Sequence, residues 1–248
     1  MAEPCQVDVF CCPKAGNSVD EYEDAWSVRS VDADRYRFAV ADGATESSFS
    51  KLWATLLVTA YTRGRVTGFE FLDQLDPLRR SWAHRVSKRP LPWYAAEKAR
   101  SGAFAALLGL ELDAPSRRWR ALAVGDCNLF QLDNVRPVMR VVQAFPLTRS
   151  SDFGSSPFLL GSRPSTDDLT PHRHLCEGAL RSEDVVLLAS DAVSAWLLRR
   201  DEEGRPAWRL VAFELGDQSA FEALIDEARQ DGMRNDDSTL VRIRFQAP

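Results

Sequence analysis

The sequence predicts an α+β fold in which antiparallel β-sheets form a sandwich and helices cover the outside. The predicted elements follow the order strands, helices, strands, helix and strand, which suits a sandwich of this kind. With 248 residues and 45% apolar composition, the chain can bury a substantial core. No repeat, low-complexity tract or linker interrupts the pattern, so we expect one domain over residues 1–248.

The charge pattern and the cysteines limit the classes of function. The net charge is −5, and acidic and basic residues are interspersed without a basic stripe. A nucleic acid or an acidic membrane is therefore not expected as a partner. The five cysteines show no paired spacing of the zinc-binding kind, and we interpret them as reduced core residues. Without a signal peptide or an apolar run near the ~20 residues that span a bilayer, the protein is expected to be soluble and cytoplasmic.

The N-terminal third contains three predicted strands. Residues 7–12 form the first, and 25–28 and 36–40 form a hairpin. Asp24 precedes one strand of this hairpin and Asp42 follows the other, so antiparallel pairing makes the two carboxylates neighbours. Their repulsion would need a cation to offset it.

The Asp42-Gly43 pair ends an apolar run, Phe38–Ala41, and is a strong turn signal. Gly43 lets the backbone bend tightly, so that its carbonyl can point the same way as the Asp42 side chain. Taken alone, the pair also fits an ordinary strand-to-helix turn in which Asp42 only caps. Candidate caps of the next helix are Thr45, Ser47 and Ser48.

The middle of the chain alternates between helices, strands and one long irregular segment. Helices are predicted over 48–62, 69–86 and 95–110, and strands over 119–124, 128–132 and 138–142, with Gly125-Asp126 at the turn between the first two strands. Residues 145–174 are rich in Pro, Ser, Gly and Asp. We expect this segment to pack beside the carboxylates as a flap and to influence substrate choice.

The C-terminal part supplies two further carboxylates at strand boundaries. The apolar strand 184–190 ends at Asp191 and runs into a helix over 194–199. A helix over 221–229 leads through an acidic loop to a final strand, which begins at Asp236.

The short acidic motifs at these strand boundaries resemble those of the type 2C metal-dependent protein phosphatases, in a divergent, bacterial-like form. The resemblance follows the same order along the chain and extends over residues 7–245. Each motif is short, but five in order at strand boundaries are a fairly specific signal. The matching residues are Glu23-Asp24-Ala25, Asp42-Gly43, Val124-Gly125-Asp126, Ser190-Asp191-Ala192 and Asp236-Asp237-Ser238-Thr239.

The resemblance implies a four-layer sandwich of two antiparallel β-sheets flanked by antiparallel helices, with two Mn²⁺ or Mg²⁺ ions between the sheets. Asp42 would bridge both ions, the Gly43 carbonyl would bind one, and Asp191 and Asp236 would bind the other. Carboxylate, carbonyl and water oxygens are the ligands that these ions prefer.

The resemblance also implies a protein serine/threonine phosphatase, a metal-dependent phosphomonoester hydrolase with a phosphorylated protein as substrate. Asp24, counted among the metal residues, and Glu23 would orient the water molecules of the ions. All five acids, Glu23, Asp24, Asp42, Asp191 and Asp236, are therefore expected at the catalytic centre.

The sequence departs from the family pattern where the substrate would bind. The family's arginine before the acidic pair is replaced by Val19 or Asp20, and the nearest basic residue upstream is Lys14, the candidate phosphate-binding residue. The family's Asp-Gly-His-Gly-Gly reads Asp42-Gly43-Ala44-Thr45-Glu46, its Gly after the third aspartate is Ala192, and its Gly-Asp-Ser-Arg reads Gly125-Asp126-Cys127-Asn128. We therefore expect the substrate class and the efficiency to differ more than the fold.

Two other functions fit the sequence less well. A catalytically weak or silent binding module would keep the sandwich, but would be free to lose the clustered acids, which are costly without cations. A metal-dependent nuclease is disfavoured by the isoelectric point near 5.4 and by the absence of a basic track.

Overall fold

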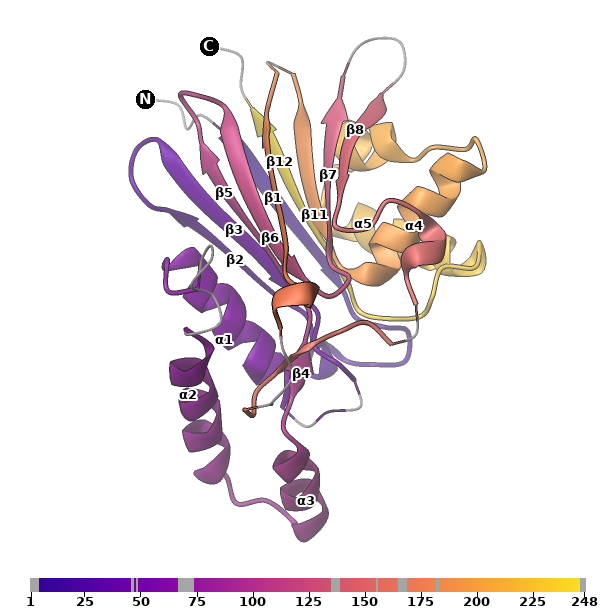
Figure 1. The fold of residues 1–248 in the computed structure, drawn as a ribbon. Coiled ribbons are helices and arrows are strands. Elements are labelled where there is room, and N and C mark those ends of the chain that lie inside the picture. Colours follow the sequence, from indigo (N-terminus) through magenta and orange to yellow (C-terminus); the bar gives the residue numbers. More distant parts are fainter. Residues whose placement is uncertain are drawn as a thin grey trace.

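The computed structural model describes residues 5–245 apart from 46, 48, 67–73, 135–138, 155, 165–168 and 182. Two five-stranded antiparallel sheets form its centre (Figure 1). The first sheet runs in the order β1 (Cys5–Cys12), β12 (Ser238–Phe245), β11 (Val185–Ala189), β7 (Asn128–Asp133) and β8 (Arg140–Phe145). The second runs in the order β10 (His174–Ala179), β6 (Arg118–Val124), β5 (Leu107–Asp113), β3 (Arg35–Ala41) and β2 (Ala25–Ser30).

Helices cover the outer face of each sheet. On the second sheet lies α1 (Ser50–Thr62), with α2 (Leu75–Ser87) packed against α1 and α3 (Trp93–Ser101) beyond the end of the sheet; on the first sheet lie α4 (Asp191–Glu202) and α5 (Gln218–Gln230). A two-stranded sheet joins β4 (Phe104–Ala105) to β9 (Leu160–Gly161). Short helical turns complete the described elements: η1 (Val19–Glu21), η3 (Ser150–Asp152), η4 (Thr170–His172) and η5 (Leu210–Glu214).

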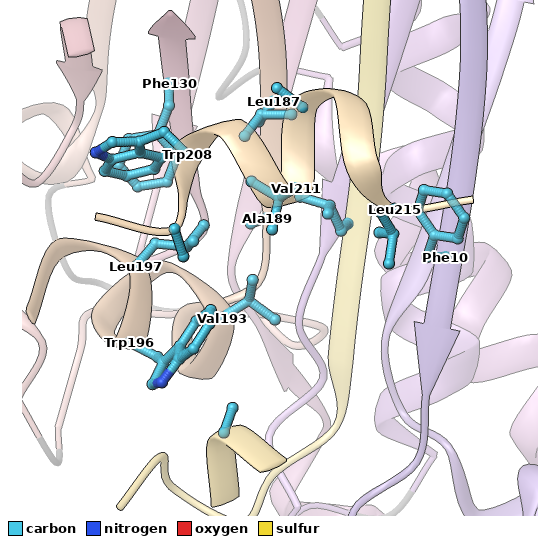
Figure 2. Close-up of a cluster of buried hydrophobic side chains, with 14 of the residues drawn as sticks. Phe10, Phe130, Leu187, Ala189, Val193, Trp196, Leu197, Trp208, Val211 and Leu215 are labelled. Atoms are coloured by element: carbon cyan, nitrogen blue, oxygen red, sulfur yellow. The ribbon is translucent and has the colours of Figure 1, made fainter. Parts of the chain in front are cut away.

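Three apolar clusters hold these layers together. One fills the space between the sheets with residues such as Phe38, Leu110 and Val241, all fully buried. A second packs Trp53 and other residues of the N-terminal helices onto the second sheet. The third lies between the first sheet and the C-terminal helices, where Figure 2 shows Phe130, Trp196 and Trp208 among others (Phe130 to Trp208 ring centroids, 5.0 Å). The layers follow the order helix, sheet, sheet and helix, which confirms the predicted fold class.

The predicted helix over 95–110 is wrong in its second half. The helix α3 ends at Ser101, and Gly102 takes φ 88°, a left-handed conformation that stops it. Leu107–Asp113 instead forms β5, whose apolar residues are buried in the middle of the second sheet. Gly109 there lies under the ring of Tyr61, where an added Cβ would be 2.2 Å from the ring. Tertiary burial thus overrides the helix-like spacing of this run.

The remaining boundaries differ by a few residues. The hairpin pairs Ala25 with Ala41 as expected. The helices predicted from 48 and 69 are observed from Ser50 and Leu75; Ser48 and residues 69–73 lie outside the described residues, as do Glu46 and Val138. The α4 helix begins at Asp191 rather than at Ser194, so this acid stands in its first turn.

The strands on either side of Gly125-Asp126 belong to different sheets, since β6 lies in the second and β7 in the first. Gly125 has φ 93°, and a Cβ there would be 2.6 Å from the Cβ of Ala106. The turn therefore crosses the sandwich and places Asp126 between the two sheets. No disulfide joins the five cysteines, and no helix in the described ranges combines the length and hydropathy needed to cross a bilayer.

Candidate metal centre

Acidic residues from both sheets converge at one end of the sandwich. Asp42 follows β3 and Asp126 follows β6, whereas Asp24, Asp236 and Asp237 stand just before β2 and β12. In antiparallel sheets the end of one strand is next to the start of its neighbour, and the pairing of Ala25 with Ala41 sets Asp24 beside Asp42. Distant parts of the chain thus deliver carboxylates to one place.

Asp24 is buried, with 2% of its surface exposed. Its Oδ2 accepts a hydrogen bond of 2.6 Å from the hydroxyl of Thr239, which also contacts the hydroxyl of Tyr22. Its Oδ1 has no hydrogen-bond partner among the described residues. Burial, followed by the charge of Asp42, raises the pKa of Asp24 well above its usual value. A buried acid with an unpartnered oxygen is suited to a cation or an ordered water.

Asp42 lies among other acids whose charges act on it. Burial raises its pKa to about 8, and the charges of Asp126 and Asp236 add to the effect. Asp126 is itself 5% exposed, and burial raises its pKa as well. Keeping these groups ionised together at neutral pH costs free energy unless a positive charge lies among them.

Arg234 brings one positive charge into this cluster. Its Nη2 contacts Oδ2 of Asp191, and its Nε lies 3.4 Å from Oδ2 of Asp236. Its charge partly offsets the rise in the pKa values of Asp42 and Asp126. Asp191 gains further from its position in the first turn of α4, where the helix dipole favours a carboxylate. The arginine therefore links Asp191 to the same cluster as Asp42 and Asp236.

Gly43 lies in a backbone cradle. It forms a bridge with Ala105, and an added Cβ would be 2.7 Å from the carbonyl oxygen of Glu23 and 3.0 Å from the Cβ of Ser50. The Glu23 carboxylate accepts a hydrogen bond from the Ser50 hydroxyl at the start of α1. Only glycine fits here without displacing the acidic pair, which explains the residue type better than turn geometry alone does.

Asp237 organises the loops around the site. One oxygen accepts a hydrogen bond of 2.9 Å from the Lys14 backbone N–H, and the other accepts one of 2.6 Å from the N–H of Glu23. The Lys14 ammonium donates to the hydroxyl of Thr45 at 3.4 Å. Lys14 thus lies at the carboxylate end of the sandwich, where it contacts Thr45, the third residue after Asp42.

The described part of the segment 145–174, which leaves out Ser155 and residues 165–168, also reaches this end. Its strand β9 pairs with β4, and Ala105 of β4 bridges to Gly43 on the other side. Its turn η3 contributes Ser150 and Ser151 to a hollow of about 260 Å³ that is also lined by Asp191 and Arg234. The segment therefore lies beside the carboxylates, as expected of a flap; its influence on substrate choice stays a prediction.

The side chains offer the oxygen ligands that divalent ions prefer, but they are not arranged around a single ion position. Within the described ranges, no three His, Cys, Asp or Glu side chains form a group ready to hold an ion. The donor set nevertheless consists of oxygens, Asp24 Oδ1 lacks a partner, and the Arg234 guanidinium stands between Asp191 and Asp236 where a cation is needed. A cation could take the place of that guanidinium.

Three residues of the cluster were not predicted as site residues. Asp126 lies in the motif Val124-Gly125-Asp126, and its position after a glycine between two predicted strands was an available signal. Asp237 directly follows Asp236, and a pair of adjacent acids before a strand gives only a weak signal. Arg234 could not have been found, because nothing local shows that its side chain turns toward Asp191.

Comparison with known proteins gives a fold match without a sequence match. No family model matches the chain, and no curated protein matches its sequence. Among solved structures, a bacterial serine phosphatase has 12% identity, a TM-score of 0.65 and 98% coverage of both chains. Serine/threonine phosphatase Stp1 from Staphylococcus aureus has 13% identity and a TM-score of 0.65, covering 98% of this chain and 95% of that one. RsbX in complex with magnesium has 15% identity and a TM-score of 0.54, covering 99% and 98%. At these identities the likeness concerns the fold, and the chain has the fold of the type 2C serine/threonine phosphatases.

Proposed function

We propose that this protein is a metal-dependent phosphomonoester hydrolase that removes phosphate from serine or threonine in proteins. The observation that carries the proposal is the convergence of Asp24, Asp42, Asp126 and Asp236 at one end of the sandwich, with raised pKa values for the first three. Groups with strongly shifted pKa values that cluster in this way are typical of functional sites. The phosphatases named in the structural comparison support the substrate class.

The chain's own oxygens would hold two Mn²⁺ or Mg²⁺ ions. Asp42 would contact both, the Gly43 carbonyl would contact one, and Asp191 and Asp236 would contact the other. Divalent ions bound there would supply positive charge that promotes ionisation of an attacking water and offsets the charge of the phosphoryl oxygens. The magnesium complex of RsbX supports the choice of ion.

Residues around the carboxylates would position the water and the phosphate. Asp24, held by Thr239, and Glu23, held by Ser50, would accept hydrogen bonds from water molecules in the site. The phosphate would approach between the flap and the Lys14 side, where Arg234 and Lys14 supply cationic groups. A fixed guanidinium suits a phosphoryl dianion better than a lysine does, because it donates two parallel hydrogen bonds.

One observation favours the alternative, a catalytically weak or silent regulatory module. The Arg234 guanidinium already compensates Asp191 and Asp236, so the chain can keep these acids together without metal. A binding module with this fold would then need no ion. The two functions differ in turnover, which a direct assay separates.

The test measures hydrolysis of p-nitrophenyl phosphate and of a phosphoserine peptide with added Mn²⁺ or Mg²⁺. The proposal predicts turnover that requires the ion, stops with a chelator and is lost in Asp191→Asn. Asp133→Asn is the matched control, because Asp133 pairs with Arg181 at the opposite end of the first sheet. Absence of metal-dependent turnover in wild-type protein that binds Mn²⁺ would favour the regulatory module.

A further inference from the structure

The helices α2 and α3 form a hairpin that extends beyond the carboxylate end of the sandwich (Figure 1). This hairpin has a charge opposite to that of the whole chain. Residues 79–100 contain seven Lys or Arg and one Glu, whereas the full sequence has a net charge of −5. The sequence shows no basic stripe because acidic residues elsewhere outnumber these positive charges. In the fold these basic residues lie together on the hairpin of α2 and α3.

Among the described residues, most of these positive charges have no counter-charge. Arg80, Arg85, Lys88 and Arg100 are exposed, and none of them forms an ion pair within the described part of the chain. Arg79 is compensated by Asp76 at 3.0 Å. Exposed cations that the protein does not neutralise attract an anionic partner and set the orientation in which it approaches.

A groove of about 320 Å³ runs between the two helices. Trp82, Val86 and Leu91 contribute apolar surface to it, while Arg89, Arg100 and Arg163 contribute positive charge. Arg163 belongs to the flap and is held in place, since its Nη2 donates to the Ala99 carbonyl at 3.2 Å and its guanidinium lies 6.0 Å from the Trp82 ring. The groove therefore combines an apolar floor with arginines from two separate segments.

The groove is connected to the candidate metal centre by a short, hydrogen-bonded path. Residues 102–105 lead from α3 into β4, and Ala105 bridges to Gly43. The Ala103 N–H also donates to the hydroxyl of Ser162 at 2.8 Å, which fixes the flap next to Arg163. Four residues of chain reach at most roughly 13 Å even when fully extended, which is therefore the upper limit for the distance that residues 102–105 span. A bound peptide would therefore need only about four residues to reach from the groove to the carboxylates.

We propose that this groove binds an acidic segment of the phosphoprotein substrate, located a few residues from the phosphorylated side chain. The proposal rests on the phosphatase function proposed above and specifies its substrate class. The arginines match acidic side chains, and the apolar floor accommodates their methylene groups or a neighbouring apolar residue. Such a contact adds affinity at a distance from the reacting bond and so selects among substrates.

A nucleic acid is the less suitable occupant. Its phosphates continue along the chain, and those beyond the groove would meet the cluster of Asp24, Asp42 and Asp126. A peptide can be acidic in one segment only, so its phosphorylated residue alone enters that cluster. The size of the groove also suits a few side chains rather than a duplex.

The test compares two phosphoserine peptides that differ only in a segment three to six residues from the phosphoserine, Asp/Glu in one and Asn/Gln in the other. For wild-type protein we expect kcat/KM to be about tenfold higher for the acidic peptide, mainly through KM. Arg89→Glu combined with Arg100→Glu should abolish this ratio, and the milder pair Arg89→Gln with Arg100→Gln should reduce it. The ratio is measured on each protein separately, so a loss of folded protein does not change it.

The matched control reverses two exposed arginines at the opposite ends of the sheets, Arg118→Glu with Arg140→Glu, and should keep the wild-type ratio. Binding of the unphosphorylated acidic peptide, followed by fluorescence anisotropy, distinguishes this proposal from the proposed function, because it requires no turnover. If the protein has no phosphatase activity but binds this peptide through Arg89 and Arg100, the groove assignment stands alone. Equal kcat/KM for both peptides, or tighter binding of a single-stranded oligonucleotide of the same charge, overturns it.

Discussion

The guanidinium of Arg234 contacts the carboxylate of Asp191, and the same side chain approaches Asp236 to 3.4 Å. These two acids are the residues proposed to hold one of the ions. Arg234 remains about half exposed, at 48% of its side-chain surface, whereas Asp191 is buried at 6%. A half-exposed cation therefore neutralises a buried acid, and a metal ion would compete with it.

Replacing Arg234 with Gln should strengthen metal binding. The substitution removes the competing positive charge, and a partly exposed ion pair of this kind is worth up to about 1 kcal/mol, or roughly fivefold in affinity. Isothermal titration with Mn²⁺ at pH 8 measures the change. Arg209→Gln, which breaks a surface pair with Glu214, is the control and should bind Mn²⁺ as wild type does. Weaker Mn²⁺ binding by the Arg234 variant would mean that the arginine supports the site.

Replacing Lys14 with Ala should lower catalytic efficiency on p-nitrophenyl phosphate. The Lys14 ammonium is tethered to Thr45 beside Asp42, so it can reach a phosphate there. Loss of one charge-assisted contact is worth roughly 1.5–3 kcal/mol, or about a 10- to 150-fold decrease in kcat/KM. Steady-state kinetics at saturating Mn²⁺ provide the value. Wild-type kinetics would remove Lys14 from the substrate site and leave Arg234 as the candidate cation there.

Local sequence signals predicted the acids that end or begin strands, because an apolar run followed by Asp-Gly or Asp-Ala marks such a boundary on its own. The convergence of Asp24 with Asp42 followed from hairpin pairing, which is also local. The long-range relations were harder to predict. The strand Leu107–Asp113 was predicted as helix, because its burial between β3 and β6 depends on residues far away in sequence.

The same limit applies to the site. Asp126 reaches the cluster only because its turn crosses from one sheet to the other, and the sequence does not state which sheet each strand joins. Arg234 and the basic groove depend on side-chain direction and on the separation of helices in space. Charge averaged over the sequence concealed the groove, since positive residues concentrated in one hairpin are balanced by acids elsewhere.

The metal-free protein should lose stability as the pH rises from about 4 to 8, and Asp42→Asn should reduce that loss. The pKa of Asp42 is raised to about 8, so the folded state resists its ionisation. The unfolded chain releases this proton near pH 4, and the difference therefore disfavours the folded state increasingly up to pH 8. Thermal unfolding in chelator measures this.

At pH 8.5 the Asp42→Asn variant should melt several degrees above wild type, and at pH 5 the difference should be small. Asp133→Asn serves as control, because its surface pair with Arg181 lies away from the cluster. Parallel pH profiles for wild type and Asp42→Asn would show that Asp42 is not the group that resists ionisation.

Gly43→Ala and Gly216→Ala should have opposite effects on stability. A Cβ at Gly43 would meet the Glu23 carbonyl oxygen at 2.7 Å and the Ser50 backbone carbon at 3.1 Å, whereas a Cβ at Gly216 would meet nothing within 4 Å. Overpacking against backbone costs roughly 1–3 kcal/mol. Alanine at an unstrained, open glycine stabilises by roughly 0.4–1 kcal/mol, because it restricts the unfolded chain. Urea unfolding of the metal-free proteins gives both values.

The same pair of variants tests the role of the Gly43 carbonyl. Moving residue 43 away from Glu23 also moves its carbonyl, so Gly43→Ala should bind Mn²⁺ more weakly than wild type in calorimetric titration. Gly216→Ala should bind it equally well. The titration is carried out under conditions in which the urea curves show both variants to be folded. A loss of affinity in Gly43→Ala then assigns the effect to the cradle, and unchanged affinity would exclude that carbonyl as a ligand.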